Sequence, residues 1–193
     1  LARLLEGLRT DLPLSSGCET TLEAGRPDTL AESNLQLAAE AGFRRICVNP
    51  QSMDPGTLVR IGRRHGPDDI QRAVAQVRAH GFPILNMDLI AGLPDESAAT
   101  FLDSLDQVRA FSPENLTIHT LSRKRGAHLS TFPPADPPGG DPVGDMLSGA
   151  WTRLHADGYR PYYLYRQKDM AGGHENTGYA LPGTECLYNA AMM

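Results

Sequence analysis

Apolar positions along the chain follow two different spacings. Residues 1–12 carry leucines at helical spacing, whereas residues 84–90 form a nearly continuous apolar run that contains one carboxylate, Asp88. Such a short run is typical of a strand buried on both faces in a parallel sheet. It ends at Gly92-Leu93-Pro94, which is a turn signal. Because an ionised carboxylate is costly to bury alone, we expect Asp88 to have a partner.

The same patterns predict helices and strands that alternate along the chain. Helices are expected at residues 1–12, 29–41, 55–62, 67–80, about 98–108 and 143–156. Strands are expected at residues 18–23, 45–48, within 82–94, at 115–121 and at 162–165. This alternation predicts an α/β fold with a parallel sheet. A complete eight-unit barrel takes about 250 residues, so four strands and a candidate fifth indicate a partial (β/α) barrel.

Proline and glycine divide the chain. The segment 131–142, TFPPADPPGGDP, predicts a loop without regular structure. We expect a partial barrel over residues 1–130, a connecting loop over 131–142 and a C-terminal extension over 143–193. All six tyrosines lie in that extension. They either face a ligand or form a lid packed on the barrel.

Composition narrows the class of protein. The 193 residues carry a formal net charge of -5 and are 40 % hydrophobic, as expected for one globular domain. The mild acidity argues against nucleic acid as a main partner, and no apolar run approaches the roughly 20 residues of a membrane span. Cys18, Cys47 and Cys186 are widely spaced, which favours a reducing cytoplasm. Because the chain starts within or at a helix without an initiator Met, we interpret it as a fragment whose upstream part is missing.

Polar residues follow or end several of the predicted strands. They are Glu23, Asn49, Gln51, Asp88, His119, Thr120 and Ser122. Parallel neighbouring strands would bring these side chains to one mouth, where Arg63 and Arg64 can fold over them. Carboxylates and guanidinium groups suit a zwitterionic ligand with hydroxyl groups, although each residue alone also suits an ordinary cap or ion pair.

A second basic set follows the strand at 115–121. Arg123, Lys124 and Arg125 either hold carboxylates of a substrate or belong to a solvated loop.

The strand and turn at 86–94, NMDLIAGLP, resemble a family signature. The sequence is similar to N-[IM]-D-L-I-x-G-L-P of the radical S-adenosylmethionine (SAM) enzymes related to oxygen-independent coproporphyrinogen III oxidase. Further segments match in register, and the Asn49-Pro50-Gln51 step and the tail resemble the HemZ-type branch most closely. These segments are 21–28, 46–53, 61–65, 116–121 and 162–168.

The resemblance implies a partial (β/α) barrel that binds SAM. Family positions that contact SAM map onto Glu23, Gln51, Arg63 and Asp88, with Arg63 taking the methionine carboxylate. It also implies an oxidoreductase of porphyrin and haem biosynthesis with a tetrapyrrole substrate. Its reaction converts coproporphyrinogen III to protoporphyrinogen IX by oxidative decarboxylation. That reaction starts with one electron from a [4Fe-4S] cluster, supplied by an electron donor that the sequence does not identify.

One departure from the family is large. The motif C-x-x-x-C-x-x-C that holds the cluster is absent, and the three cysteines are too far apart to replace it. We expect that motif upstream of Leu1, so this chain should not ligate a cluster or start radical chemistry by itself. Two alternatives stay open: a haem-binding chaperone of the wider family, and an unrelated (β/α) domain without a cofactor.

Overall fold

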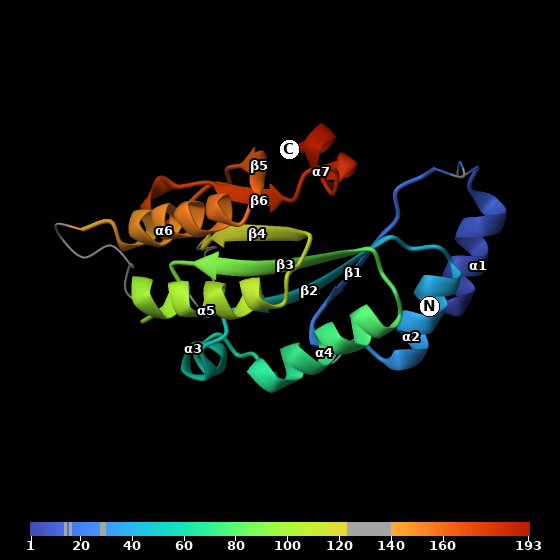
Figure 1. The fold of residues 1–193 in the computed structure, drawn as a ribbon, viewed down its shortest axis with the longest axis horizontal. Helices are drawn as coiled ribbons and strands as arrows, with labels where there is room; N and C mark the ends of the chain where they lie inside the picture. The colour runs from blue at the N-terminus through green and yellow to red at the C-terminus, as the bar shows by residue number, and fades with distance from the viewer. Residues whose placement is uncertain (14, 16, 28–29, 123–139) are drawn as a thin grey trace.

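One sheet organises the chain in the computed structural model, which describes residues 1–13, 15, 17–27, 30–122 and 140–193 (Figure 1). The helices are α1 Ala2–Asp11, α2 Glu32–Glu40, α3 Pro55–Arg60, α4 Pro67–Ala79, α5 Ala98–Ala110, α6 Pro142–Ala156, the 3-10 turn η3 Ala171–Gly173, and α7 Leu187–Met192. The strands are β1 Thr21–Gly25, β2 Arg45–Gln51, β3 Ile84–Ala91, β4 Asn115–Thr120, β5 Arg160–Tyr165 and β6 Asn176–Ala180.

Within the described residues the sheet has six strands in the order β1-β2-β3-β4-β6-β5. Strands β1 to β4 are parallel, β6 is antiparallel to β4, and β5 is antiparallel to β6. The predicted α/β class and its four parallel strands are confirmed. The sequence analysis did not predict β6 or α7, and β5 does not continue the parallel series.

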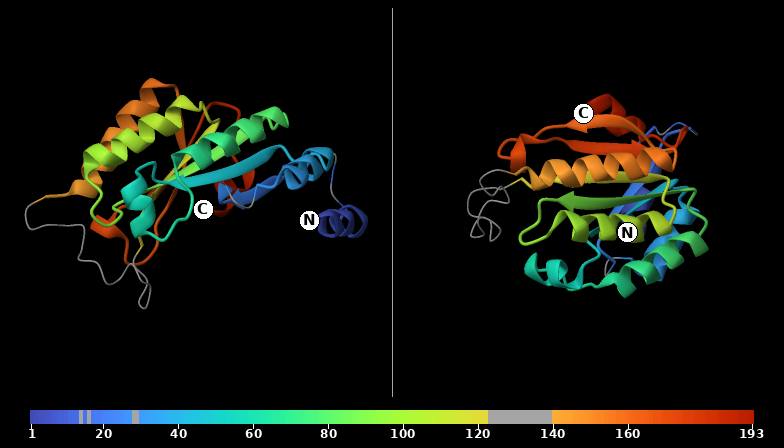
Figure 2. Two further views of the ribbon diagram at one scale, coloured as in Figure 1. Left: turned by 90° about the horizontal axis from the view of Figure 1, so that it is seen from below. Right: turned by 60° about the vertical axis from the view of Figure 1, so that its left-hand side comes forward.

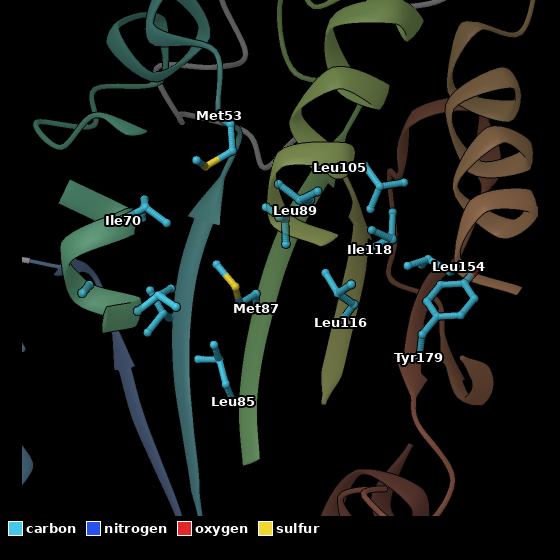
Figure 3. Packing of buried hydrophobic residues seen from close by; sticks show 14 of the residues in the cluster. Met53, Ile70, Leu85, Met87, Leu89, Leu105, Leu116, Ile118, Leu154 and Tyr179 are labelled. Carbon is cyan, nitrogen blue, oxygen red and sulfur yellow. The ribbon is translucent and has the colours of Figure 1, made fainter. Parts of the chain in front are cut away.

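Helices α4, α5 and α6 lie together on one side of the sheet (Figure 2). Leu85, Met87 and Leu89 of β3 point toward these helices and belong to one buried cluster with Leu105 of α5 and Leu154 of α6 (Figure 3). Each buried leucine or methionine there stabilises the fold by about 1.5–3 kcal/mol through removal of apolar surface from water. The other side chains of β3 alternate with these, and Ile84, Asn86 and Ile90 are only half-buried. Strand β3 is therefore fully buried on its helix side but not on both faces.

Local signals set the ends of the helices near the site. Helix α3 begins after Asp54, whose Oδ2 accepts a hydrogen bond from the Thr57 N–H at 2.6 Å, with Pro55 at the first helical position. Gly42 follows α2 with a φ of 82° and Gly81 follows α4 with a φ of 73°. Both glycines therefore end their helices in the left-handed region, as predicted.

Strand β1 starts three residues later than predicted. Thr21 pairs with Arg45, which is the first residue of β2, and Thr20 O accepts a hydrogen bond from the Arg45 N–H at 3.1 Å just before the ladder begins. The side chain of Glu19 also contacts Arg45, whose Nη2 donates a hydrogen bond to Glu19 Oε1 at 2.6 Å.

The predicted loop at 131–142 and the basic set at Arg123, Lys124 and Arg125 fall mainly outside the described residues. Pro142, the last residue of that loop, begins α6. In the part of the chain that the structure describes, no helix is both long and apolar enough to cross a membrane.

Candidate functional site

The side of the sheet that faces away from the buried cluster carries polar side chains, and we call it the inner face. In-register pairing places Glu23 of β1 beside Cys47 of β2, and Cys47 beside Asn86 of β3. Asp88 lies two residues after Asn86, so both side chains point to this face. The inner face is defined by Glu23, Cys47, Asn86, Asp88, Thr117 and His119.

Asp88 has two polar partners, as expected for a carboxylate in a largely buried strand. Asn86 Nδ2 donates to Asp88 Oδ1 at 2.8 Å, and His119 Nε2 lies 3.4 Å from Asp88 Oδ2. The Asp88 side chain keeps 12 % of its surface exposed. A carboxylate that has two partners and remains partly exposed can still accept hydrogen bonds from a ligand.

Electrostatic coupling links three inner-face groups. Burial by itself lowers the pKa of His119, but the hydrogen bond and negative charge of Asp88 outweigh burial, so the pKa is raised above its ordinary value. Although Glu23 stands on the edge strand, desolvation of its carboxyl group raises its pKa. The hydrogen bond from Cys47 opposes that rise, and the charge of Asp88 adds to it. The charge of Asp88 therefore acts on both Glu23 and His119 and raises both pKa values.

The thiol of Cys47 belongs to the same network. Cys47 Sγ lies 3.2 Å from Glu23 Oε1 and donates to it. Burial raises the pKa of the thiol well above its ordinary value. A protonated, buried thiol is a hydrogen-bond donor here, because nucleophilic and metal-binding cysteines need the thiolate.

Gln51 ends β2 in an unusual backbone conformation. It is buried and has a φ of 70°, which is uncommon for a residue with a Cβ atom. Such strain persists only where the surroundings fix it, and it often marks a functional position.

Buried hydrogen bonds fix the residues directly after Gln51. Ser52 Oγ donates to Glu96 Oε1 at 2.7 Å, and the Met53 N–H donates to Ser104 Oγ at 3.0 Å. Burial raises the pKa of Glu96 to about 7, against the opposing effect of the Ser52 hydrogen bond. This network ties the end of β2 to the loop after β3 and to α5.

Arg63 lies beyond the carboxyl ends of β1 and β2. It lines a cavity of about 540 Å³ together with Arg26, Arg64, His65 and Asp69. Of the four predicted cofactor residues, Glu23 and Asp88 share the inner face, Gln51 stands at the strand end, and Arg63 stands in this strand-end cavity.

A second cavity of about 340 Å³ lies between the inner face and the C-terminal segment. Its walls include Glu23, Cys47 and Asn86 from the sheet, and Tyr162 and Tyr188 from the tyrosine-rich extension. Tyr159 and Tyr179 are buried instead. The extension therefore contributes both to a cavity wall and to packing.

Sequence reasoning missed several inner-face residues. Asn86 stands two positions before Asp88, and this period-2 relation was a signal that could have found it. Cys47 was not among the predicted site residues, because its hydrogen bond to Glu23 depends on pairing across 24 positions of sequence.

The residues present fit SAM better than they fit an iron–sulfur cluster. The carboxylates of Glu23 and Asp88 and the amide of Gln51 provide acceptors for ammonium and hydroxyl groups. The guanidinium of Arg63, which lines the larger cavity, provides a donor fork for a carboxylate. Among the described residues, no group of three His, Cys, Asp or Glu side chains is placed to hold a metal ion. Cys18 is exposed whereas Cys47 and Cys186 are buried, so the three thiols offer no shared ligand set.

Comparison with known proteins identifies a family and its fold. The model of the Radical SAM superfamily matches residues 2–108. The oxygen-independent coproporphyrinogen-III oxidase-like protein HemZ of Bacillus subtilis is 43 % identical over 178 residues, which are 91 % of this chain and 35 % of HemZ. The heme chaperone HemW of Escherichia coli is 32 % identical over 186 residues, which are 96 % of this chain and 46 % of HemW. The chain thus spans between a third and a half of the length of these relatives.

A solved structure shares the fold. Coproporphyrinogen III oxidase (HemN) from Escherichia coli superposes with a TM-score of 0.79 at 22 % identity, covering 95 % of this chain and 40 % of that chain.

Proposed function

The chain belongs to the radical SAM superfamily, and on that premise we propose that its inner face and strand-end cavity bind SAM. The observation that carries this proposal is that Glu23 of β1 and Asp88 of β3 share the inner face, with Arg63 beyond the strand ends. A zwitterionic nucleoside needs that combination of acceptors and a cation.

Each residue has a role that follows from its chemistry. Arg63 offers a two-pronged donor to the methionine carboxylate. Glu23, Asp88 and Gln51 accept hydrogen bonds from the ammonium and ribose hydroxyl groups. His119 and Asn86 orient the Asp88 carboxylate, so the acceptor is held in place before the ligand arrives.

When bound, SAM supplies one-electron chemistry that removes a hydrogen atom from a substrate. The chain's own contribution is to bind, to orient and to exclude water, because the protein positions a cofactor that performs the difficult chemistry. The cluster that delivers the electron has no ligand set among the described residues, so this chain provides the SAM side of the site.

For the whole protein we propose oxidative decarboxylation of coproporphyrinogen III to protoporphyrinogen IX. The 43 % identity to an oxidase-like HemZ supports this reaction, with a tetrapyrrole as substrate and an electron donor as partner. Residues 1–130 and 143–193 then act as one unit joined by the loop 131–142, since β4 and β6 pair in one sheet. Free cysteines suit a cytoplasmic location.

A haem chaperone is the second candidate function. The 32 % identity to HemW over nearly the whole chain favours it. A chaperone binds haem stoichiometrically, whereas an oxidase releases protoporphyrinogen.

One experiment separates these functions. The protein with its full flanking sequence is incubated anaerobically with iron, sulfide, dithionite, SAM and coproporphyrinogen III, and in parallel with haemin. Formation of protoporphyrinogen that depends on SAM supports the oxidase. Stoichiometric haem binding without product supports the chaperone, and absence of SAM binding in either assay contradicts the proposed site.

A further inference from the structure

The strand-end cavity is strongly basic for a chain with a net charge of -5. Among the described residues that line it are three guanidinium groups, those of Arg26, Arg63 and Arg64, and one carboxylate, that of Asp69. A basic concavity in an otherwise acidic protein focuses its field on anions.

Asp69 also lines the cavity, but both of its carboxylate oxygens already have partners. One carboxylate oxygen accepts the Gly66 N–H at 2.8 Å, and the other pairs with Arg72. The Gly66 hydrogen bond holds the pKa of Asp69 below its ordinary value, with the Arg72 charge acting in the same direction. Asp69 is therefore an ionised helix-capping residue of α4.

Two of the guanidinium groups exceed what SAM requires. One carboxylate on SAM is matched by one fork, that of Arg63. Arg26 comes directly after β1, and Arg64 follows Arg63 after the turn at Gly62, whose φ is 71°. Both residues are exposed.

The volume is also larger than the end of one amino acid needs. About 540 Å³ lies within the range of roughly 300–1,000 Å³ that holds a drug-sized organic ligand. The cavity thus has space and charge for a second molecule beside the methionine end of SAM.

We propose that Arg26 and Arg64 form a carboxylate-binding subsite that holds the substrate through its acidic side chains, next to Arg63. The ligand class is an organic polycarboxylate, which in the context of the proposed function is a tetrapyrrole with propionate groups. This inference rests on the proposed function for the identity of the substrate. It assigns the substrate's acids to the cavity beyond β1 and β2.

Binding of coproporphyrin III, the air-stable porphyrin with four carboxylates, tests the subsite. Fluorescence titrations compare the wild-type protein with the double variant Arg26→Gln/Arg64→Gln. Arg44→Gln is the matched control, because Arg44 is an exposed arginine just before β2, at the opposite end of that strand. The double variant is expected to bind coproporphyrin III at least tenfold more weakly, and Arg44→Gln is expected to bind like the wild type. Raising the salt from 50 to 300 mM should weaken wild-type binding more than binding by the double variant.

SAM titrations on the same samples keep the two proposals distinct. Porphyrin binding that weakens more than SAM binding in the double variant supports the subsite, and Arg64→Lys should restore part of the porphyrin affinity. Equal porphyrin affinity in the wild type and the double variant overturns the subsite. So does a wild-type protein that binds SAM but no coproporphyrin III, and this result leaves the proposed SAM site standing. If SAM itself fails to bind, the proposed function fails independently.

Discussion

The Nε2 atom of His119 on β4 lies 3.4 Å from Oδ2 of Asp88 on the neighbouring strand β3. The two residues come from predicted strands 31 positions apart, and the parallel register of β3 and β4 brings them together. This pair couples the acceptor proposed for SAM to a group that titrates near neutral pH.

Histidine titration provides a first prediction. The pKa of His119 should lie above about 6.5 in the wild type and should fall in Asp88→Asn, because the hydrogen bond and charge of Asp88 are removed. Since a raised histidine pKa stabilises the fold at low pH, the stability difference between wild type and His119→Asn should be largest below about pH 6.5. It should shrink as the pH rises through the folded pKa. Imidazole NMR titration measures the pKa, and an unchanged value in Asp88→Asn would rule out the coupling.

Titration of Glu96 provides a second prediction, and its effect on stability has the same direction as that of His119. Its folded pKa of about 7 is above the ordinary value of 4.5, so the protonated form favours the fold. The contribution of Glu96 to the free energy of unfolding is therefore fully present below about pH 4.5 and is lost as the pH rises through 7. The loss is on the order of 3 kcal/mol. In Glu96→Gln this decline should disappear, as measured by urea unfolding from pH 5 to 8.5.

The matched control for Glu96 is Glu6→Gln. Glu6 is exposed on α1, so this change should leave the pH dependence of stability as in the wild type. If Glu96→Gln retained the decline between pH 5 and 8, another group would have to carry it.

Two substitutions of Gln51 distinguish its effect on stability from its proposed role in SAM binding. A Cβ atom at a φ of 70° costs about 1 kcal/mol or more, so Gln51→Ala keeps this cost while losing the side chain. The free energy of unfolding should therefore be about 1 kcal/mol larger for Gln51→Gly than for Gln51→Ala. Both variants should bind SAM about fivefold more weakly, which is the effect of one lost hydrogen bond. Urea unfolding and calorimetric titration test the two halves, and full SAM affinity in both variants would remove Gln51 from the site.

The contact between Gly178 and Tyr163 fixes the antiparallel part of the sheet. A Cβ atom at Gly178 would stand 1.8 Å from Cε1 of Tyr163, so Gly178→Ala overpacks the β5–β6 pair. We expect a loss of about 1–3 kcal/mol in the free energy of unfolding. Tyr163→Ala in the same chain should relieve part of that loss in a double-mutant cycle.

Gly17→Ala is the control for this steric argument. A Cβ atom there would have no neighbour within 4 Å, so its stability should match the wild type. Equal losses for both glycine variants would contradict a steric role of the Tyr163 ring, because the entropy effect of replacing glycine by alanine stabilises the fold.

The parallel half of the sheet was predictable because its strands have strong local signals. The run 84–90 is apolar enough to mark β3, and Gly42 and Gly81 mark helix ends. Strand β6 has the sequence NTGYA, which lacks an apolar alternation and contains a glycine. It forms because β4 offers an open edge and because Gly178 makes room for Tyr163. Neither condition can be recognised from the sequence of residues 176–180 alone.

The site shows the same division. The acceptors on β1 and β3 were identified from strand ends and from a family resemblance. The partner of Arg45 illustrates what was not predictable, since Thr184 O accepts from it across 139 positions of sequence at 3.1 Å. The basic cavity required the turn after α3 to bring Arg64 near Arg26, which no spacing rule describes.

The most direct measurement of the central claim is calorimetric titration of SAM into the wild-type protein, Asp88→Asn and Arg63→Gln, with Arg44→Gln as control. Asp88→Asn keeps the shape of the side chain and removes its charge, and Arg63→Gln removes the proposed carboxylate fork. We expect saturable binding by the wild type and Arg44→Gln, and at least tenfold weaker binding by both site variants. SAM affinities that are equal in all four proteins, or absent in the wild type, would contradict it.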